Sequence, residues 1–169
     1  MQINSYAKIN LGLHVLNARE DGFHNIATIF QELNFCDQIT IKESQKMSFD
    51  TNVDWLDRTN NTCIKAVKIL QNHYSGLPNF KIFLQKNIPT NAGLGGGSSN
   101  GTATLKAINQ LCGLNIQEKE MKKFAEKISA DSTFFVNGGL QGGEQKGEKL
   151  YPNKYSAIDA YILLVMPNI

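Results

Sequence analysis

The sequence Ile88-Pro89-Thr90-Asn91-Ala92-Gly93-Leu94-Gly95-Gly96-Gly97-Ser98-Ser99 contains four glycines within five residues. Glycine has no Cβ atom, so this backbone can reach positive φ angles and turn several N–H groups toward one point. The residues that follow have helical apolar spacing: Thr102, Leu105, Ile108 and Leu111. We expect Ser98 or Ser99 to cap the first turn of that helix. The loop amides and the positive end of the helix would then converge on one anion.

A plainer interpretation of the same segment is a tight strand-to-helix turn, in which glycine serves only close packing. The density of glycine and the two hydroxyls at its end favour a phosphate-binding loop instead. No Gly-Lys-Ser or Gly-Lys-Thr occurs in the segment, which excludes the nucleoside triphosphatase P-loop. Its glycine spacing also differs from the dinucleotide-binding fingerprint.

Size and composition are those of an ordinary globular domain. The chain has 169 residues, of which 41% are hydrophobic and 19% charged, enough for one domain with its own core. The net charge of +2 is spread without a basic stripe, so no nucleic-acid partner is expected. Three widely spaced cysteines match neither a disulfide framework nor a zinc site. The sequence shows no membrane span or signal peptide, and we expect a cytoplasmic protein without a membrane partner.

The N-terminal segment Ile3–Val15 alternates as a strand does. On one continuous strand, Lys8, Asn10 and His14 would share a polar face. That face could line a binding site or be the solvent-exposed side of an edge strand, and spacing alone does not decide between the two.

Further strands are expected before and after the glycine-rich loop. Asp21-Gly22 marks a turn, and residues 26–33 and 38–41 read as the next strands of an antiparallel meander. Residues 80–85 alternate again and lead into the glycine-rich loop. Residues 160–165 are wholly apolar, which predicts a final strand buried on both faces.

Helices are expected in the middle of the chain. Asn61 and Thr62 precede an apolar-periodic run and are suited to cap a helix. A second charged, amphipathic pattern surrounds Met121, Phe124 and Ile128. Strands early and late with helices between them indicate an α+β fold.

Three requirements of phosphoryl transfer have candidates in this sequence. Gly93–Ser99 would hold the phosphates, and the hydroxyl of Ser98 or Ser99 could bind Mg²⁺. Lys8 could supply a positive charge and Asp131 a general base, provided that the fold brings them together. On the sequence pattern alone a cap or turn role is favoured for Asp131, because it lies between small residues at a helix end.

Four segments resemble the GHMP kinases, the superfamily of galactokinase, homoserine kinase, mevalonate kinase and phosphomevalonate kinase. They are most similar to its members that phosphorylate 4-diphosphocytidyl-2-C-methyl-D-erythritol. The segments are Ala7-Lys8-Ile9-Asn10-Leu11, Arg19-Glu20-Asp21-Gly22-Phe23-His24, Gly93-Leu94-Gly95-Gly96-Gly97-Ser98-Ser99-Asn100, and Ala130-Asp131 followed by Phe134-Phe135. The resemblance implies a ribosomal protein S5 domain 2-like fold, with a mixed or antiparallel sheet and helices packed on one side.

The resemblance also implies an activity and roles for individual residues. The reaction would be ATP-dependent phosphorylation of the cytidine diphosphate-linked methylerythritol at its 2-hydroxyl, in the non-mevalonate route to isoprenoid precursors. Asp131 would take the hydroxyl proton, Lys8 would stabilise developing charge, and Asn10 would support them. Phe23 would stack on the cytosine ring, a role that needs only an aromatic face, and His24 would hydrogen-bond its edge.

The cofactors implied are ATP and Mg²⁺, with Ser98 as a metal ligand by way of the nucleotide. The implied ATP-binding set is Asn61, Lys86, Pro89, Gly93, Leu94, Gly95, Gly96, Gly97, Ser98 and Ser99. Two departures from the family pattern stand near these residues. Asn91-Ala92 replaces glycines that are common at the start of the loop, and Ser132-Thr133 replaces a Val-Pro after the aspartate.

The kinases of this superfamily have a second, C-terminal domain that we do not find in residues 1–169. We therefore expect the chain to be the N-terminal, ATP-binding domain, with weak nucleotide binding and little or no turnover of its own. Two other functions remain open, namely another GHMP kinase of the homoserine or mevalonate type, and a non-catalytic nucleotide-binding module. The oligomeric state is not predicted.

Overall fold

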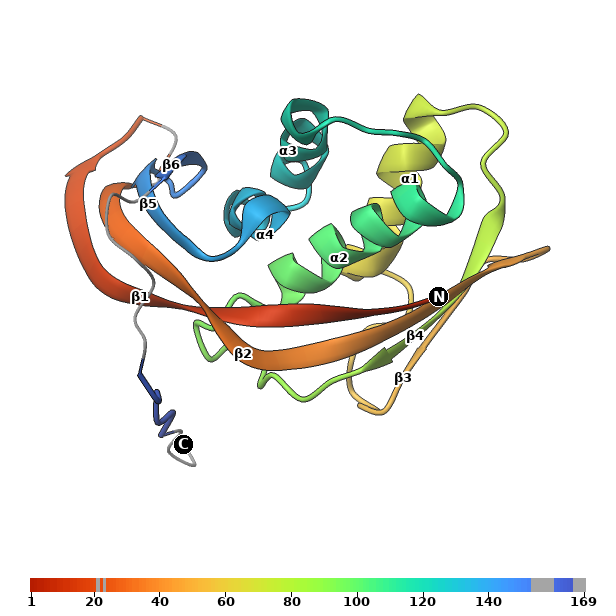
Figure 1. The fold of residues 1–169 in the computed structure, drawn as a ribbon, viewed down its shortest axis with the longest axis horizontal. Coiled ribbons are helices and arrows are strands. Elements are labelled where there is room, and N and C mark those ends of the chain that lie inside the picture. Colours follow the sequence, from red (N-terminus) through yellow and green to blue (C-terminus); the bar gives the residue numbers. More distant parts are fainter. Residues whose placement is uncertain (21, 23, 153–159, 166–169) are drawn as a thin grey trace.

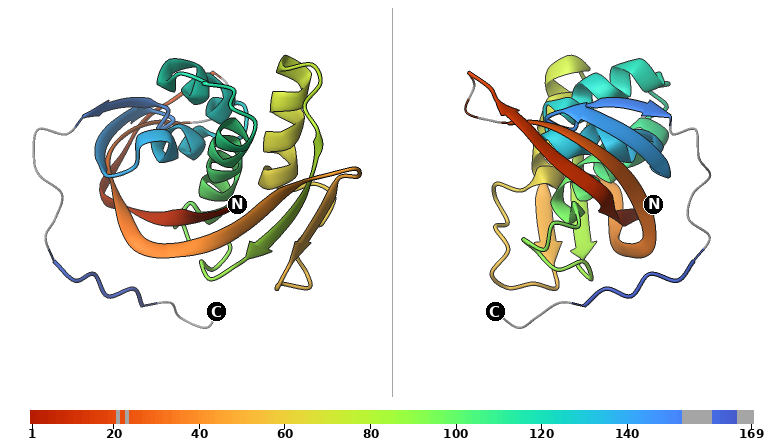
Figure 2. Two further views of the ribbon diagram at one scale, coloured as in Figure 1. Left: turned by 45° about the vertical axis from the view of Figure 1, so that its right-hand side comes forward. Right: turned by 90° about the vertical axis from the view of Figure 1, so that its left-hand side faces the viewer.

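The computed structural model describes residues 1–20, 22, 24–152 and 160–165. They form a mixed α+β fold, in which a six-stranded sheet is covered by helices on one side (Figure 1). Figure 2 shows from two further directions how the sheet curves around the helices. The predicted fold class is confirmed.

Two long strands, β1 (Gln2–Ala18) and β2 (His24–Ser44), form an antiparallel hairpin that spans the sheet. The prediction of separate strands over residues 26–33 and 38–41 is wrong, because β2 runs through both. The register skips two residues between the Tyr6–Cys36 and Ala7–Leu33 pairs. A bulge therefore stands where the sequence suggested a break between strands.

Bulges also change which side chains of β1 share a face. Lys8 lies opposite Glu32 and Asn10 opposite Phe30, so these side chains point to one side of the sheet. A second register shift follows Asn10, and His14 then pairs with Ala27 on the other face. The grouping of Lys8 with Asn10 is confirmed, whereas the placement of His14 with them is wrong. His14 is exposed.

The remaining strands extend the sheet from β2. β4 (Asn79–Gln85) pairs with the C-terminal half of β2, and β5 (Leu140–Gln145) pairs with its N-terminal half. β3 (Ser48–Thr51) runs parallel to β4, and β6 (Lys149–Pro152) is antiparallel to β5. β4 delivers the chain to the glycine-rich loop, as expected.

The helices pack on the sheet through their apolar faces. They are α1 (Thr62–His73), α2 (Gly96–Leu111), α3 (Glu118–Glu126), a 3₁₀ turn over Ala130–Thr133, and α4 (Phe134–Asn137). The core between sheet and helices includes Ile39, Ile41, Leu70, Phe80, Ile82, Leu105 and Ile108, all fully buried. None of the helices in the described ranges is both long and apolar enough to cross a membrane.

The predicted cap of α2 is wrong in detail. The helix begins at Gly96, and its N-cap is Gly95 in the left-handed conformation, with no side-chain hydrogen bond to the first turn. Ser98 and Ser99 lie inside the first turn of the helix and bond to other segments. Glycine makes this start possible because a positive φ costs it no steric clash.

The predicted final strand over residues 160–165 is also wrong. Those residues form no strand, and Tyr161, Leu163 and Val165 are strongly exposed. Apolar composition gives a segment the propensity for a strand but no partner to pair with. Among the described strands, none pairs with this segment.

Candidate active site

The fold brings Lys8 and Asp131 together, although 122 positions separate them in the sequence. The Lys8 Nζ atom lies 3.3 Å from Asp131 Oδ2, with the Lys8 side chain 7% exposed and that of Asp131 33% exposed. Lys8 Nζ also donates to Asn10 Oδ1 at 2.8 Å and lies 5.2 Å from the centroid of the Phe30 ring. A buried ammonium thus faces a carboxylate that solvent or substrate can reach.

Hydroxyl groups hold the turn that carries Asp131. Thr133 Oγ1 donates to Ala130 O at 3.1 Å, and Ser132 Oγ lies 2.6 Å from Ser129 Oγ. Thr102 of α2 donates to Ser132 O at 2.9 Å. Ser132 and Thr133 are buried, so these contacts are protected from water. They fix the turn where the family pattern has a proline.

The glycine-rich loop lies against the strand that carries Lys8. The Lys8 backbone N–H donates to Leu94 O at 2.9 Å. Gly95 has φ +69°, and a Cβ there would stand 2.8 Å from Phe135 Cζ and 3.1 Å from Lys8 Cγ. Asn91 replaces a glycine of the family pattern and has φ 59°, a conformation that asparagine tolerates better than most residues. The loop therefore approaches Lys8 closely because it has few side chains.

The starts of two helices meet at this loop. Thr62, the first residue of α1, donates its hydroxyl to Gly97 O at 2.6 Å. Ser98 Oγ accepts a hydrogen bond from Ser129 Oγ at 2.8 Å and is partly exposed. Apart from its chain neighbours and the backbone of its own helix, no atom lies within 4 Å of a Cβ built on Gly97, so the first turn of α2 opens to free space. Helix N-termini carry partial positive charge, which suits this space to an anion.

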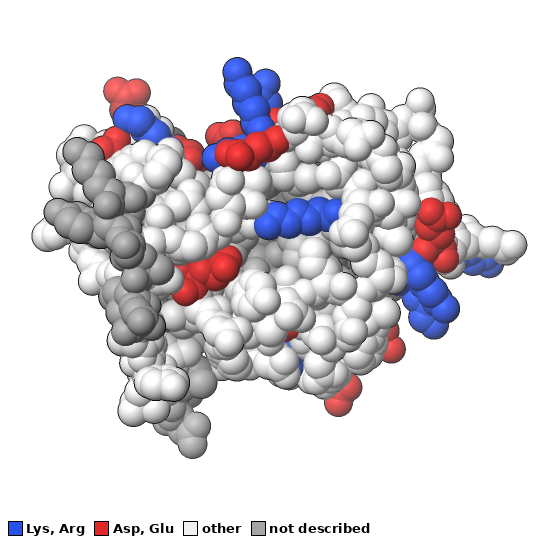
Figure 3. Space-filling model, in the orientation of Figure 1, with Lys and Arg blue, Asp and Glu red and all other residues white. Residues whose placement is uncertain are grey.

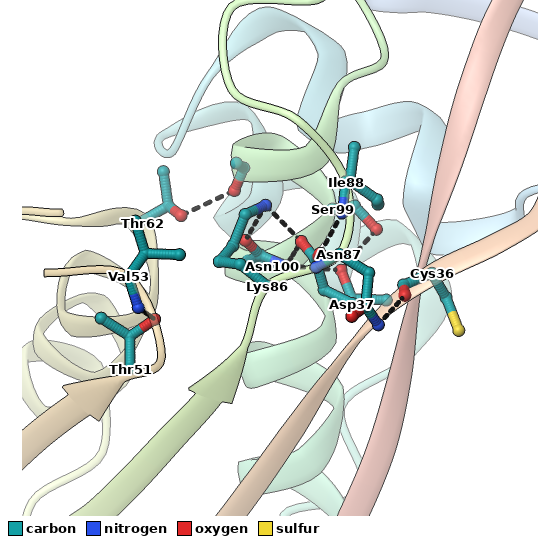
Figure 4. Close-up of polar contacts among 12 residues, drawn as sticks. Cys36, Asp37, Thr51, Val53, Thr62, Lys86, Asn87, Ile88, Ser99 and Asn100 are labelled. Atoms are coloured by element: carbon teal, nitrogen blue, oxygen red, sulfur yellow. Dashed lines mark hydrogen bonds and ion pairs between the residues drawn. The ribbon is translucent and has the colours of Figure 1, made fainter. Parts of the chain in front are cut away.

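A buried polar network lies beneath the loop and joins β2, the segment that follows β4, and α2 (Figure 4). Asp37 is fully buried and accepts hydrogen bonds from Lys86 Nζ, from Asn100 Nδ2 at 2.8 Å, and from the Asn87 and Ile88 amides at 2.7 and 2.8 Å. The sequence analysis did not single out Asp37. Asp37 lies two and four positions before the apolar Ile39 and Ile41, so on a strand all three side chains share one face. This spacing could have indicated that the carboxylate faces the core.

Ser5 connects this network to the first turn of α2. Its hydroxyl donates to Ser99 Oγ at 2.7 Å and accepts from Asn100 Nδ2 at 3.0 Å. Ser99 is 2% exposed. The structure thus places Ser99 behind the loop as a support, whereas Ser98 lies on its more accessible side.

The other residues expected to bind ATP surround the loop at different depths. The Lys86 side chain forms an ion pair with Asp37 and is 6% exposed. Its Nζ atom lies 3.1 Å from the position that a Cβ on Gly96 would take. Asn61 caps α1 by accepting from the Cys63 and Ile64 amides. Pro89 is half-buried in the segment before Gly93. Contact of these residues with a nucleotide stays a prediction.

His24, one of the residues expected to recognise the substrate, lies at the end of the β1–β2 hairpin. His24 is the first residue of β2 and is exposed. Phe23 lies outside the described residues. Ile26, two positions after His24, and Asp131 both lie near the turn between β5 and β6. A Cβ on Gly147 in that turn would lie 3.7 Å from both Ile26 Cδ1 and Asp131 Oδ1.

A separate hollow of about 510 Å³ lies between β1, α2 and α4, and neither Lys8 nor Asp131 lines it. Figure 3 shows this face hollowed between strands and helices, with a basic side chain lying across it. Glu32 and Lys106 line the hollow. Burial raises the pKa of Glu32, an effect that Lys106 partly offsets, and burial lowers the pKa of Lys106. Ser5 and Ser99 also line it, so the hollow lies behind the loop.

The residues present fit a nucleotide with Mg²⁺ in the open space beside Gly97. The Asp131 carboxylate and the Ser98 hydroxyl are hard oxygen donors, which Mg²⁺ prefers. No group of three or more His, Cys, Asp or Glu side chains that could hold a metal occurs among the described residues. An ion here would therefore keep most of its ligands from phosphates and water.

Substitution of single glycines tests the shape of the loop. We expect Gly95→Ala to destabilise the chain by roughly 2–4 kcal/mol, because a left-handed alanine is strained and its Cβ meets Phe135. Gly97→Ala is the matched control and should raise stability by up to about 1 kcal/mol, since alanine favours the helix. Its methyl group would enter the free space, so affinity for an ATP analogue should fall. Urea denaturation and calorimetry measure both effects, and equal stabilities of the two variants would contradict this account.

Comparison with known proteins identifies the class to which this fold and loop belong. Residues 61–139 match the family model described as the GHMP kinases N terminal domain, a range that includes the glycine-rich loop and Asp131. The chain carries a GHMP kinase N-terminal domain.

Several proteins similar to this chain are kinases that carry the name of the same substrate. The chain is 41% identical over 149 residues to the 4-diphosphocytidyl-2-C-methyl-D-erythritol kinase of Persephonella marina, covering 88% of this chain and 54% of that protein. It is 40% identical over 168 residues to the kinase of the same name from Francisella tularensis, covering 98% of this chain and 60% of that protein. The chain thus spans little more than half the length of these relatives.

Solved structures agree with this assignment. A crystal structure of 4-(cytidine 5'-diphospho)-2C-methyl-D-erythritol kinase matches with a TM-score of 0.77 and 29% identity, covering 90% of this chain and 55% of that one. The mevalonate kinase of Methanococcus jannaschii matches with a TM-score of 0.68 and 19% identity, covering 92% of this chain and 56% of that one. The second match shows the fold alone.

Proposed function

We propose that residues 1–169 form the ATP-binding domain of a kinase that phosphorylates an alcohol group of a small molecule. The observation that carries this proposal is the 3.3 Å contact between Lys8 Nζ and Asp131 Oδ2 beside the glycine-rich loop. A base, a positive charge and a phosphate-binding loop are the parts that phosphoryl transfer to a hydroxyl requires.

Each part has a definite task in this reaction. ATP with Mg²⁺ supplies the phosphoryl group and neutralises charge on its phosphates. The backbone N–H groups at the start of α2 hold those phosphates. Asp131 accepts the proton of the substrate hydroxyl, and the Lys8 ammonium stabilises the negative charge that develops on the oxygen. The hydrogen bond from Lys8 to Asn10 holds the ammonium at that position.

The substrate that we propose is 4-diphosphocytidyl-2-C-methyl-D-erythritol, phosphorylated at its 2-hydroxyl. Support comes from relatives at 40 and 41% identity that bear this substrate in their names. His24 would hydrogen-bond the cytosine edge, and Phe23 would stack on its ring. The exposed position of His24 at the start of β2 leaves its ring free for such a ligand.

Calorimetric titration of the chain tests this proposal. We expect binding of a non-hydrolysable ATP analogue with Mg²⁺, weakened by Gly97→Ala, and binding of the cytidyl ligand, weakened by His24→Ala. His14→Ala is the matched control, because His14 is also exposed but points to the other face from Lys8. Binding of the ATP analogue alone would support a GHMP kinase with another substrate, such as homoserine or mevalonate. Failure of both ligands to bind would contradict the proposal for this chain.

A further inference from the structure

A bulge in β1 lies beside a backbone carbonyl that a side chain of β2 contacts. Asn10 pairs with Phe30 and Gly12 pairs with Ile29, so the ladder between β1 and β2 shifts register around Leu11. Bulges disrupt the regular ladder of hydrogen bonds. The Gly12 carbonyl accepts a hydrogen bond from the hydroxyl of Thr28 in β2, at 2.7 Å.

The direction of the hydrogen bonds around Thr28 follows from this contact. A carbonyl oxygen can only accept, so the Thr28 hydroxyl uses its one proton on Gly12. The Thr28 oxygen then serves only as an acceptor, and the Asn10 amide must turn its NH₂ group toward it. Asn10 Nδ2 lies 2.7 Å from Thr28 Oγ1. This leaves the Asn10 Oδ1 atom for Lys8 Nζ, at 2.8 Å.

We propose that Thr28 is a positioning residue, which fixes the orientation of the Asn10 amide and through it the Lys8 ammonium. The inference deepens the proposed function and rests on its assignment of Lys8. Without the hydroxyl, the Asn10 amide could turn over and present its NH₂ group to a positively charged nitrogen. Lys8 would then lose its neutral acceptor and keep the contact with Asp131 and its position over the Phe30 ring.

The surroundings of Thr28 allow its hydroxyl to be removed at nearly constant shape. Thr28 is 5% exposed. Its methyl group lies 3.3 Å from the position of a Cβ on Gly143, so the methyl side of the residue packs against β5. Valine keeps both branches at Cβ but lacks the proton donor, whereas serine keeps the hydroxyl and lacks the methyl group. The two variants therefore separate packing from hydrogen bonding.

Nuclear magnetic resonance of the 169-residue chain tests the inference without any assay of phosphoryl transfer. The signals are the ¹⁵Nζ–¹H resonance of Lys8, assigned by its loss in Lys8→Met, and the side-chain amide of Asn10. We expect Thr28→Val to speed hydrogen exchange of the Lys8 ammonium at least tenfold and to shift the Asn10 amide. Thr28→Ser should restore both signals. Thr40→Val, at an exposed position of the same strand, should leave both unchanged.

Unchanged Lys8 and Asn10 signals in folded Thr28→Val would overturn the inference. If that variant does not fold, the unaltered chain decides: nuclear Overhauser contacts must join the Asn10 NH₂ hydrogens to the Thr28 side chain. Contacts from those hydrogens to the Lys8 ammonium would refute the orientation. Because neither measurement needs substrate, a failure here differs from a failure of the proposed function, which the ligand titrations would reveal.

Discussion

Replacement of Asp131 by asparagine is expected to lower the rate of phosphoryl transfer by about 10²- to 10⁴-fold, the usual contribution of a general base. Asparagine retains the shape of the side chain but cannot accept the substrate proton. Affinity for an ATP analogue should stay nearly unchanged, because the loop amides do not depend on Asp131. The rate is best measured in a chimera. In it, residues 1–152 of this chain are joined to the remaining part of the Persephonella marina kinase, the part that does not align with this chain.

Glu32→Gln is the matched control for this experiment. Glu32 is also a half-buried carboxylate on the helix side of the sheet, and it lies opposite Lys8 in the strand ladder. Its side chain lines the separate hollow, whereas the Lys8 ammonium contacts Asn10, Asp131 and the Phe30 ring. The rate of the chimera with Glu32→Gln should remain close to that of the unsubstituted chimera. Full activity of Asp131→Asn would show that another group takes the proton. A chimera that binds nucleotide but never turns over would favour a non-catalytic nucleotide-binding module.

The largest effect on stability is expected from Asp37→Ala. This change leaves the ammonium of Lys86, which is 6% exposed, without its counterion, and the amides of Asn87 and Ile88 without their acceptor. Removal of one partner from a buried ion pair typically costs about 3–5 kcal/mol. Small domains have about 5–15 kcal/mol of stability in total. Urea denaturation of the 169-residue chain should therefore show a large fall in the transition midpoint.

Two further variants interpret that result. Asp54→Ala removes an exposed carboxylate 3.8 Å from Arg58 and should change stability little. Asp37→Asn keeps an oxygen for the backbone amides and loses only the charge, so its effect should fall between the other two. A small effect of Asp37→Ala would show that water or another group replaces the carboxylate. The network would then not be needed to support the loop.

Local patterns in the sequence were sufficient to predict the loop and its neighbouring elements. The glycines, the apolar spacing after them and the alternation before them predicted a strand, a loop and a helix in that order, and β4 and α2 confirm it. The Asn61 cap was equally local, since an asparagine side chain reaches the next amides along the chain.

Features that depend on pairing between distant segments could not be read from the sequence. The bulge that follows Asn10 decides that His14 does not share the face of Lys8 and Asn10. A single extra residue reverses every side chain that follows it. The contacts of Thr28 were missed for the same reason, because the carbonyl that its hydroxyl meets belongs to Gly12, next to the bulge. The segment 160–165 shows the opposite error, in which a strong local preference found no partner strand.

The network beneath the loop also has a consequence for the order of folding. Its hydrogen bonds join residues 94 and 95 positions apart in the chain, as Ser5 does with Ser99 and Asn100. Contacts of such large sequence separation form slowly, since the entropy of closing a long loop must be overcome first. During synthesis, Ser5 cannot form these bonds until α2 has left the ribosome. We therefore expect the contacts beneath the glycine-rich loop to form late, after the β1–β2 hairpin.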